Sequence, residues 1–273
     1  MPPISGLTTR PNKTLHPIND MDDSLAQQLK YLRFNGLLAH WDDSLELAAK
    51  NNFSHDRFLR HVIQDEYRIR RENARAFRLK RAAIPEALVM ETYPFNRQPK
   101  LNKKKIMALY DSMSFMTNAQ NILWLGRTGC GKTGLATGFL IHAINQGYSG
   151  RSVLFADLIN QLYQSVADHS QAKLMRKYLS YDILLIDEIG YIEVEPVQVG
   201  LFFTLMQKRH KKKPTLITSN LGFSDWGSFL KNDHLTAALI DRLTETSHVF
   251  NMKQCKGLRP TLNPEDELSS DLQ

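Results

Sequence analysis

The chain of 273 residues is long enough for one medium-sized domain together with a smaller one. Apolar residues make up 42% of it and charged residues 23%, which is ordinary for a protein with a sizeable core. The formal net charge of +7 favours a polyanionic partner. Two cysteines exclude a disulfide framework, and we find no membrane span and no signal-peptide core. We therefore expect a cytoplasmic protein.

The first ninety residues predict a flexible arm followed by helices. Residues 1–20 are rich in Pro, Thr and Asn and show no periodicity. A first helix begins near Asp22, Gly36 separates it from a second, and a third runs from about Ser54 to Pro85. The expected core stripe at the start of the third helix consists of Phe58, Leu59, Val62, Ile63 and Tyr67.

The third predicted helix is strongly basic. Between Arg57 and Arg81 lie nine Lys and Arg residues against three acids. One interpretation is a solvated face with some ion pairs one turn apart. The other is a surface for DNA phosphates, because arginine makes directional contacts to phosphate oxygens. The candidate contacts are Arg68, Arg71 and Arg75.

Prolines mark a joint between residues 85 and 105, and this segment ends in three consecutive lysines. We place the domain boundary there, which gives a helical N-terminal domain (21–92) and a nucleotide-binding domain (93–260). Tyr93 and Phe95 at the joint offer rings to pack on a planar group. The polar, acidic residues 261–273 are expected to be disordered.

The segment Asn121–Gly134 predicts a phosphate loop. A short apolar run enters a glycine-rich loop, and Lys132 and Thr133 then open an apolar-faced helix. This is the strand, loop and helix context that the G-x-x-x-x-G-K-[ST] motif requires. Lys132 is expected to reach the β- and γ-phosphates of ATP, and the Thr133 hydroxyl to bind Mg²⁺. The predicted ATP-binding residues are Gly126, Arg127, Thr128, Gly129, Cys130, Gly131, Lys132, Thr133 and Gly134.

A second motif, Ile183–Gly190, predicts the hydrolytic groups. Its continuous apolar run is typical of a strand buried on both faces in a parallel sheet. Asp187 at the end of this strand is expected to hold Mg²⁺, and Glu188 to act as general base towards water. A glutamate at this position favours ATP hydrolysis. Before it, the sequence predicts a strand at 152–156 and helical segments at 157–167 and 170–179.

The rest of the chain completes an α/β pattern. A helix is expected at Pro196–Arg209 and a strand at Pro214–Asn220, with the basic run 208–213 in an exposed loop between them. Asn220 lies at the carboxyl end of its strand, where ligands bind in doubly wound sheets, so we expect it to contact the γ-phosphate or the water. A helix at 234–246 and a strand at 247–252 follow.

Four segments together resemble one family: LGRTGCGKTGLA, ILLIDEIGYI, LITSNLGFSDW and ALIDRL, in this order and spacing. They are similar to the AAA+ ATPases of the IstB/DnaC group, above all to IstB-type transposition helper proteins of insertion sequences. The resemblance covers about residues 22–260. It implies a parallel five-stranded sheet of order 5-1-4-3-2 behind a small helical domain.

The resemblance also implies roles for residues that the motifs above do not explain. Arg242 in ALIDRL matches an arginine finger that acts in trans on a neighbour's site, and Arg259 resembles the ATP-binding sensor 2 residue, although Cys255–Leu258 before it departs from the usual pattern. The helical insertion before the ILLIDEIG strand implies DNA contacts at Lys173, Arg176 and Lys177.

For the whole protein, the resemblance implies ATP-dependent oligomerisation on double-stranded DNA and recruitment of a cognate transposase to that DNA. A replicative helicase loader shares the same ATPase motifs and is the first alternative. A nucleotide-gated DNA-binding module with little hydrolysis is the second, and the set Asp187, Glu188, Asn220 and Arg242 counts against it. For Cys130, a filler between two glycines is favoured over a redox role.

Overall fold

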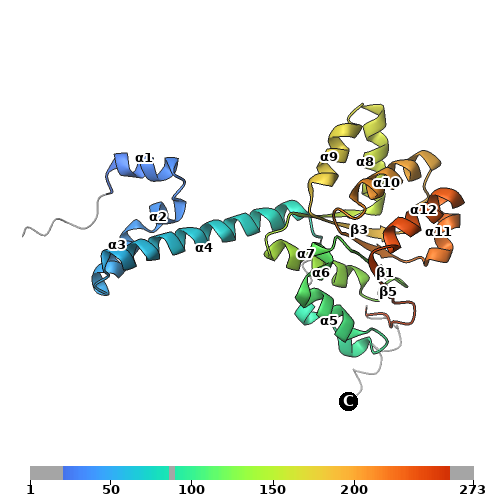
Figure 1. The fold of residues 1–273 in the computed structure, drawn as a ribbon, viewed down its shortest axis with the longest axis horizontal. Coiled ribbons are helices and arrows are strands. Elements are labelled where there is room, and N and C mark those ends of the chain that lie inside the picture. Colours follow the sequence, from blue (N-terminus) through green and yellow to red (C-terminus); the bar gives the residue numbers. More distant parts are fainter. Residues whose placement is uncertain (1–20, 86–89, 259–273) are drawn as a thin grey trace, which may run out of the picture. The chain divides into compact units, whose positions relative to one another are not determined.

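The computed structural model describes residues 21–85 and 90–258, and the chain forms two compact units that divide between Ala74 and Arg75 (Figure 1). The predicted arm (1–20) and acidic tail (261–273) lie outside the described residues. The division falls inside a helix. The described residues 75–85 and 90–92, which we assigned to the N-terminal domain, thus belong to the unit that carries the sheet.

A buried carboxylate organises the helices of the first unit. Glu66 is 4% exposed and accepts the backbone N–H groups of Gly36 and Leu37 at 2.8 and 3.1 Å. Arg70 Nε donates to the same carboxylate at 2.9 Å, so that the buried charge is paired. The helices are α1 (Asp23–Tyr31), α2 (Asn35–Ala39), α3 (Trp41–Lys50) and the beginning of α4 (His55–Ala82).

The sequence predicted three helices in the N-terminal region, and the structure has four, α1 to α4. Gly36 lies inside α2. Glycine is favoured at this position because a Cβ there would come within 2.5 Å of the Ile69 side chain. The break between the first two helices falls just before Gly36, at residues 32–34, and a further break at His40, which we did not predict, separates α2 from α3. Three residues that we predicted to be buried at the start of α4 are exposed instead. Leu59, Ile63 and Tyr67 have exposed fractions of 58, 56 and 65%.

The second unit is built on a fully parallel sheet with the order β2-β3-β4-β1-β5. In chain numbering this is 5-1-4-3-2 read from the other edge, so the predicted AAA+ topology is confirmed. The strands are β1 (Asn121–Leu125), β2 (Gly150–Leu154), β3 (Ile183–Ile189), β4 (Thr215–Ser219) and β5 (Ser247–Asn251).

Two apolar clusters cover the two faces of this sheet. Alternate residues of β1 divide between them, with Leu123 and Leu125 in one and Ile122 and Trp124 in the other. The first cluster includes side chains of α8, α10 and α12, and the second those of α5, α6 and α7. Burial on both faces explains why the strands lack polar alternation.

The remaining elements follow the sequence order. They are the short 3₁₀ helices η1 (Met90–Thr92) and η2 (Phe95–Arg97) and the α-helices α5 (Lys103–Ser112), α6 (Ser114–Thr117), α7 (Lys132–Asn145), α8 (Phe155–Ala167), α9 (Gln171–Ser180), α10 (Pro196–Arg209), α11 (Phe223–Leu230) and α12 (Asp233–Thr244). None of the helices within the described ranges has the length and apolar character needed to cross a membrane.

Most element predictions in this unit are confirmed, with three corrections. The strand expected at 152–156 ends at Leu154, and α8 begins at the next residue. Helices α5, α6 and α11 were not predicted. The run 208–213 is not simply an exposed loop, because Arg209 is only 1% exposed and Lys213 is half-buried.

Candidate active site

The phosphate loop joins β1 to α7, and its glycines are required by backbone geometry. Gly129 and Gly131 have φ angles of 79° and 90°, in the left-handed region that favours glycine. At Gly126 a Cβ would come within 2.6 Å of the Met252 backbone. Helix α7 begins directly at Lys132, so the loop ends at the first, intrahelically unpaired N–H groups of a helix, which attract anions.

A cavity of about 640 Å³ opens above this loop at the carboxyl ends of the strands. Its walls combine the phosphate loop with the end of β3 and the segment around Tyr93. The lining residues are Pro85, Thr92, Tyr93, Pro94, Thr128, Gly129, Gly131, Lys132, Thr133, Gly134, Leu154, Asp187, Glu188, Tyr191, Thr218 and Leu258. The cavity therefore gathers the predicted phosphate, magnesium and base residues at one place.

Lys132 is folded over the loop that precedes it. Its Nζ donates to the carbonyl oxygens of Gly126 and Arg127 at 2.8 and 2.9 Å, and the residue is 7% exposed. These neutral acceptors compensate the buried ammonium group. Phosphate oxygens would be stronger partners for the same charge, because charge-assisted hydrogen bonds are about twice as strong as neutral ones.

Asp187 forms the centre of a hydroxyl–carboxylate group. Its Oδ1 accepts from Thr133 Oγ1 at 3.1 Å and from Thr218 Oγ1, and the residue is 3% exposed. Thr218 Oγ1 in turn accepts the backbone N–H of Glu188 at 3.0 Å. A hydroxyl and a carboxylate oxygen side by side form a donor set that fits Mg²⁺, which is bound by one or two such ligands together with substrate phosphates.

Glu188 is set apart from its strand by local backbone geometry. The pairing of β3 with β4 shifts register between Ile186 and Ile189, and Glu188 has a φ of 64°. Such a conformation is costly for a residue other than glycine and is common at functional sites. The consequence is an exposed carboxylate that lines the cavity directly beside the buried Asp187.

Other predicted loop residues have supporting positions. Cys130 is 1% exposed, and its Sγ donates to the Arg127 carbonyl at 2.9 Å, as expected for a structural filler. Arg127 is exposed and does not line the cavity. Gln98 Nε2 donates to the carbonyls of Cys130 and Lys256 at 3.3 and 2.6 Å, which fastens the loop to the segment after β5.

Two aromatic residues contribute to the cavity walls. Tyr93 lines the cavity, and burial, followed by the thiols of Cys255 and Cys130, raises the pKa of its hydroxyl. That hydroxyl donates to the Cys130 carbonyl at 3.3 Å. Tyr191, which the sequence motifs did not single out, forms a 2.7 Å hydroxyl contact with Thr128 and so links the loop to the segment after β3.

Two of the predicted catalytic residues, Asn220 and Arg242, do not line the cavity. Asn220 follows β4, and its Oδ1 is buried without a hydrogen-bond partner among the described residues. Thr218, two residues earlier, lines the cavity instead. Arg242 on α12 donates to the Ala238 carbonyl at 3.0 Å, and its guanidinium carbon lies 5.0 Å from the Phe203 ring centroid. Arg259 lies outside the described residues.

The predicted DNA contacts have different surroundings in the two units. In the first unit, Arg68 pairs with Asp65 at 3.1 Å and Arg71 is exposed. In the second, Arg75 Nε donates to Asn145 Oδ1 at 2.7 Å. The α9 candidates Lys173, Arg176 and Lys177 are all exposed.

The sheet order, the phosphate loop and the acidic pair at the end of β3 together define a P-loop ATPase of the AAA+ class. The family described as IstB-like ATP binding protein matches residues 27–259. The chain therefore belongs to this family of insertion-sequence ATPases.

Two relatives agree with this assignment, and a solved structure shares the fold. A protein of insertion sequence IS21 from Pseudomonas aeruginosa, named for ATP binding, is 32% identical over 82% of this chain and 84% of its own. Its counterpart from insertion sequence IS5376 of Geobacillus stearothermophilus is 30% identical over 85% and 92%. The replication initiator DnaA bound to AMPPCP and single-stranded DNA shares the fold, with a TM-score of 0.50 and 16% identity over 62% of this chain and 50% of that one.

Proposed function

We propose that this protein is a Mg²⁺-dependent ATPase that assembles on double-stranded DNA and delivers a cognate transposase to that DNA. The observation that carries the proposal is the meeting of Lys132, Thr133, Asp187 and Glu188 in one cavity. Membership of an insertion-sequence family supports transposition as the process served. A protein with this task would act in the cytoplasm.

The proposed reaction divides its work among these side chains. Lys132 leaves the loop carbonyls and donates to the β- and γ-phosphates. Thr133 and Asp187 would hold Mg²⁺, which would neutralise phosphate charge. Glu188 accepts a proton from water as the water oxygen bonds to the γ-phosphorus. The bond to the β–γ bridging oxygen breaks, and ADP and inorganic phosphate leave.

Arg242 is proposed to act on the site of a neighbouring subunit. Its side chain is half-buried, donates to the Ala238 carbonyl within α12 and does not line the cavity of its own chain. An arginine that stabilises the transition state from a second subunit would make hydrolysis dependent on assembly. This arrangement supports a homo-oligomer whose DNA-bound form contains ATP.

The experiment that tests the proposal measures binding of the protein to duplex DNA with ATP, with ADP and without nucleotide. We expect stable assemblies on DNA with ATP, their release with ADP, and faster ATP turnover when duplex DNA is present. Equal DNA binding in all three states would contradict the proposal. Capture of the transposase encoded beside the gene, rather than of a replicative helicase, separates this function from that of a helicase loader.

A further inference from the structure

A second cavity, of about 240 Å³, lies at the other end of β2 from the nucleotide site. Its walls come from the end of α4, the beginning of β2 and the end of α9, and include Arg78, Arg81, Ser149, Gly150, Ser180 and Tyr181. Gly150 begins β2 and lines this cavity, whereas Leu154 ends β2 and lines the nucleotide cavity. Four residues of strand, about 13 Å, separate the two.

Two arginines, Arg78 and Arg81, line this cavity. The Nε atoms of Arg78 and Arg151 are buried and have no hydrogen-bond partner among the described residues. Arg151 is not a lining residue, but its Nη1 donates to the Arg81 carbonyl at 3.0 Å, so its guanidinium group lies against the backbone of a residue that is. Within the described part of the chain, no carboxylate forms an ion pair with any of the three.

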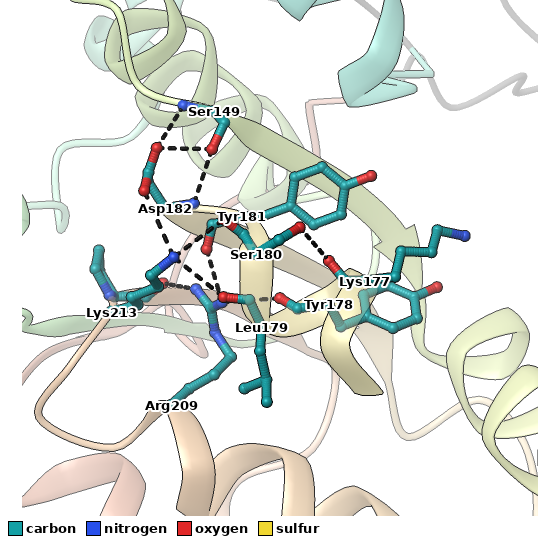
Figure 2. A network of polar contacts seen from close by, with 10 residues as sticks. Ser149, Lys177, Tyr178, Leu179, Ser180, Tyr181, Asp182, Arg209 and Lys213 are labelled. Carbon is teal, nitrogen blue, oxygen red and sulfur yellow. Dashed lines mark hydrogen bonds and ion pairs between the residues drawn. The ribbon is translucent and has the colours of Figure 1, made fainter. Parts of the chain in front are cut away.

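Asp182, an acidic residue hydrogen-bonded to the cavity wall at Ser149, already has partners. Figure 2 shows Asp182 directed at Ser149, whose N–H and Oγ–H donate to its Oδ2 at 2.9 and 2.6 Å. Lys213 Nζ lies 3.6 Å from its other oxygen. Burial raises the pKa of the Asp182 carboxyl, but the Ser149 hydrogen bonds and Lys213 outweigh that effect and lower it overall. Asp182 thus stays charged and committed to these partners.

The partial negative charge at the carboxyl end of α9 is neutralised by cationic side chains. A helix C-terminus carries partial negative charge on its last carbonyl groups and would repel an anion. Here Arg209 Nη1 donates to the carbonyls of Tyr178 and Tyr181 at 3.1 and 3.0 Å (Figure 2). Lys213 Nζ donates to those of Leu179 and Ser180 at 3.1 and 3.0 Å. The helix end therefore does not cancel the arginine charge.

We propose that this arginine-lined cavity binds a phosphodiester group of duplex DNA. The planar guanidinium fork matches two phosphate oxygens, and a phosphate would give the buried Nε of Arg78 the acceptor it lacks. The exposed cations of α9 beside the cavity continue the positive surface, which favours a polyanion over a small free anion. This inference rests on the proposed function and assigns a DNA site to residues outside the motifs.

The test compares the full-length Arg78→Gln/Arg81→Gln variant, the single Arg81→Gln variant and wild type. Binding of a fluorescent duplex is followed by anisotropy across a salt series. Loss of one phosphate contact should reduce the log–log slope by about 0.9, so we expect a reduction of about 0.9 for the double variant and a smaller reduction for the single variant. Lys104→Gln removes one exposed charge on α5, outside the cavity, and should leave the slope unchanged.

Three results would overturn the inference. One is a wild-type slope in Arg81→Gln, whose exposed side chain can be replaced without unfolding the protein. Another is an equal loss in Lys104→Gln, which would assign the effect to net charge alone. The third is that inorganic phosphate at low millimolar concentration lowers the slope of wild type as much as the substitutions do, which would indicate a small-anion site. If wild type itself fails to bind duplex DNA, the proposed function fails instead.

Discussion

At the centre of the nucleotide cavity, single hydroxyl groups position the acidic pair. Thr218 donates to Asp187 and accepts the backbone N–H of Glu188, so its one hydroxyl ties the metal ligand to the base. The link also supports the left-handed backbone of Glu188. Thr218 is therefore a positioning residue whose loss should affect turnover more than ATP binding.

Replacing Thr218 by valine tests this role. The change keeps the shape of the side chain but leaves Asp187 and the Glu188 N–H each without one partner. We expect kcat to fall about 10- to 100-fold, the range found when residues behind metal ligands are changed, with little change in KM.

The control for this substitution is Thr236→Val on α12. The Thr236 hydroxyl is buried with no hydrogen-bond partner among the described residues, so its removal should leave kcat unchanged and stability equal or higher. Equal kcat values for the two variants would show that the hydroxyl of Thr218 does not position the acidic pair.

Asp187 and Glu188 could be predicted because they follow each other in one contiguous motif. Thr218 could not, since it stands inside an apolar strand and meets Asp187 only through the pairing of β3 with β4. The exposed position of Arg127 could not be predicted either, because the loop motif does not reveal which way each side chain points.

At the scale of elements, Arg209 joins α10, α9 and β4. It donates to the carbonyls of Tyr178, Tyr181 and Pro214 and to Thr215 Oγ1, and it is 1% exposed. Burial lowers its pKa to about 10, so the guanidinium group remains charged at neutral pH. The four acceptors replace water around the charge.

Arg209→Met should therefore destabilise the sheet unit. Each buried carbonyl left without a donor costs about 1–3 kcal/mol, so we expect a loss of about 3 kcal/mol or more in the free energy of unfolding. Lys212→Met, in the same basic run but exposed, should stay within about 0.5 kcal/mol of wild type. Denaturant unfolding measures both, and similar values for the two would remove the structural role of Arg209.

The sequence pattern predicted elements well where a long apolar face or a motif specified them, as for α10, whose predicted bounds are confirmed. The pattern gave a wrong prediction where the residue types of a segment do not reveal its surroundings. The basic run was taken for a solvated loop because burial of Arg209 depends on carbonyl groups contributed by α9. The end of β2 was misplaced because apolar residues continue without a break into α8.

At the scale of the whole molecule, the position of Arg242 outside its own cavity leads to a prediction about shared sites. Arg242→Ala should bind ATP almost normally but lose hydrolysis, since fingers of this kind contribute about 10³–10⁵ in rate. Lys132→Ala should lose both. In a mixture, an intact Lys132 site can meet an intact Arg242, so part of the ATPase activity should return.

The single variants provide the controls for this mixing experiment. Neither protein alone should regain activity at the total concentration of the mixture. If Arg242→Ala alone keeps most of its turnover on DNA, the charge instead belongs to α12 alone and has no role in trans.

The central claim is that Glu188 converts a nucleotide-binding cavity into a hydrolytic one. The most direct measurement is the ATP turnover of Glu188→Gln with Mg²⁺ and duplex DNA, together with its ATP affinity. The amide keeps the size of the side chain but cannot accept the proton from water. We predict near-normal ATP affinity and a turnover at least about 100-fold slower. A variant that hydrolyses ATP at nearly the wild-type rate would contradict the account.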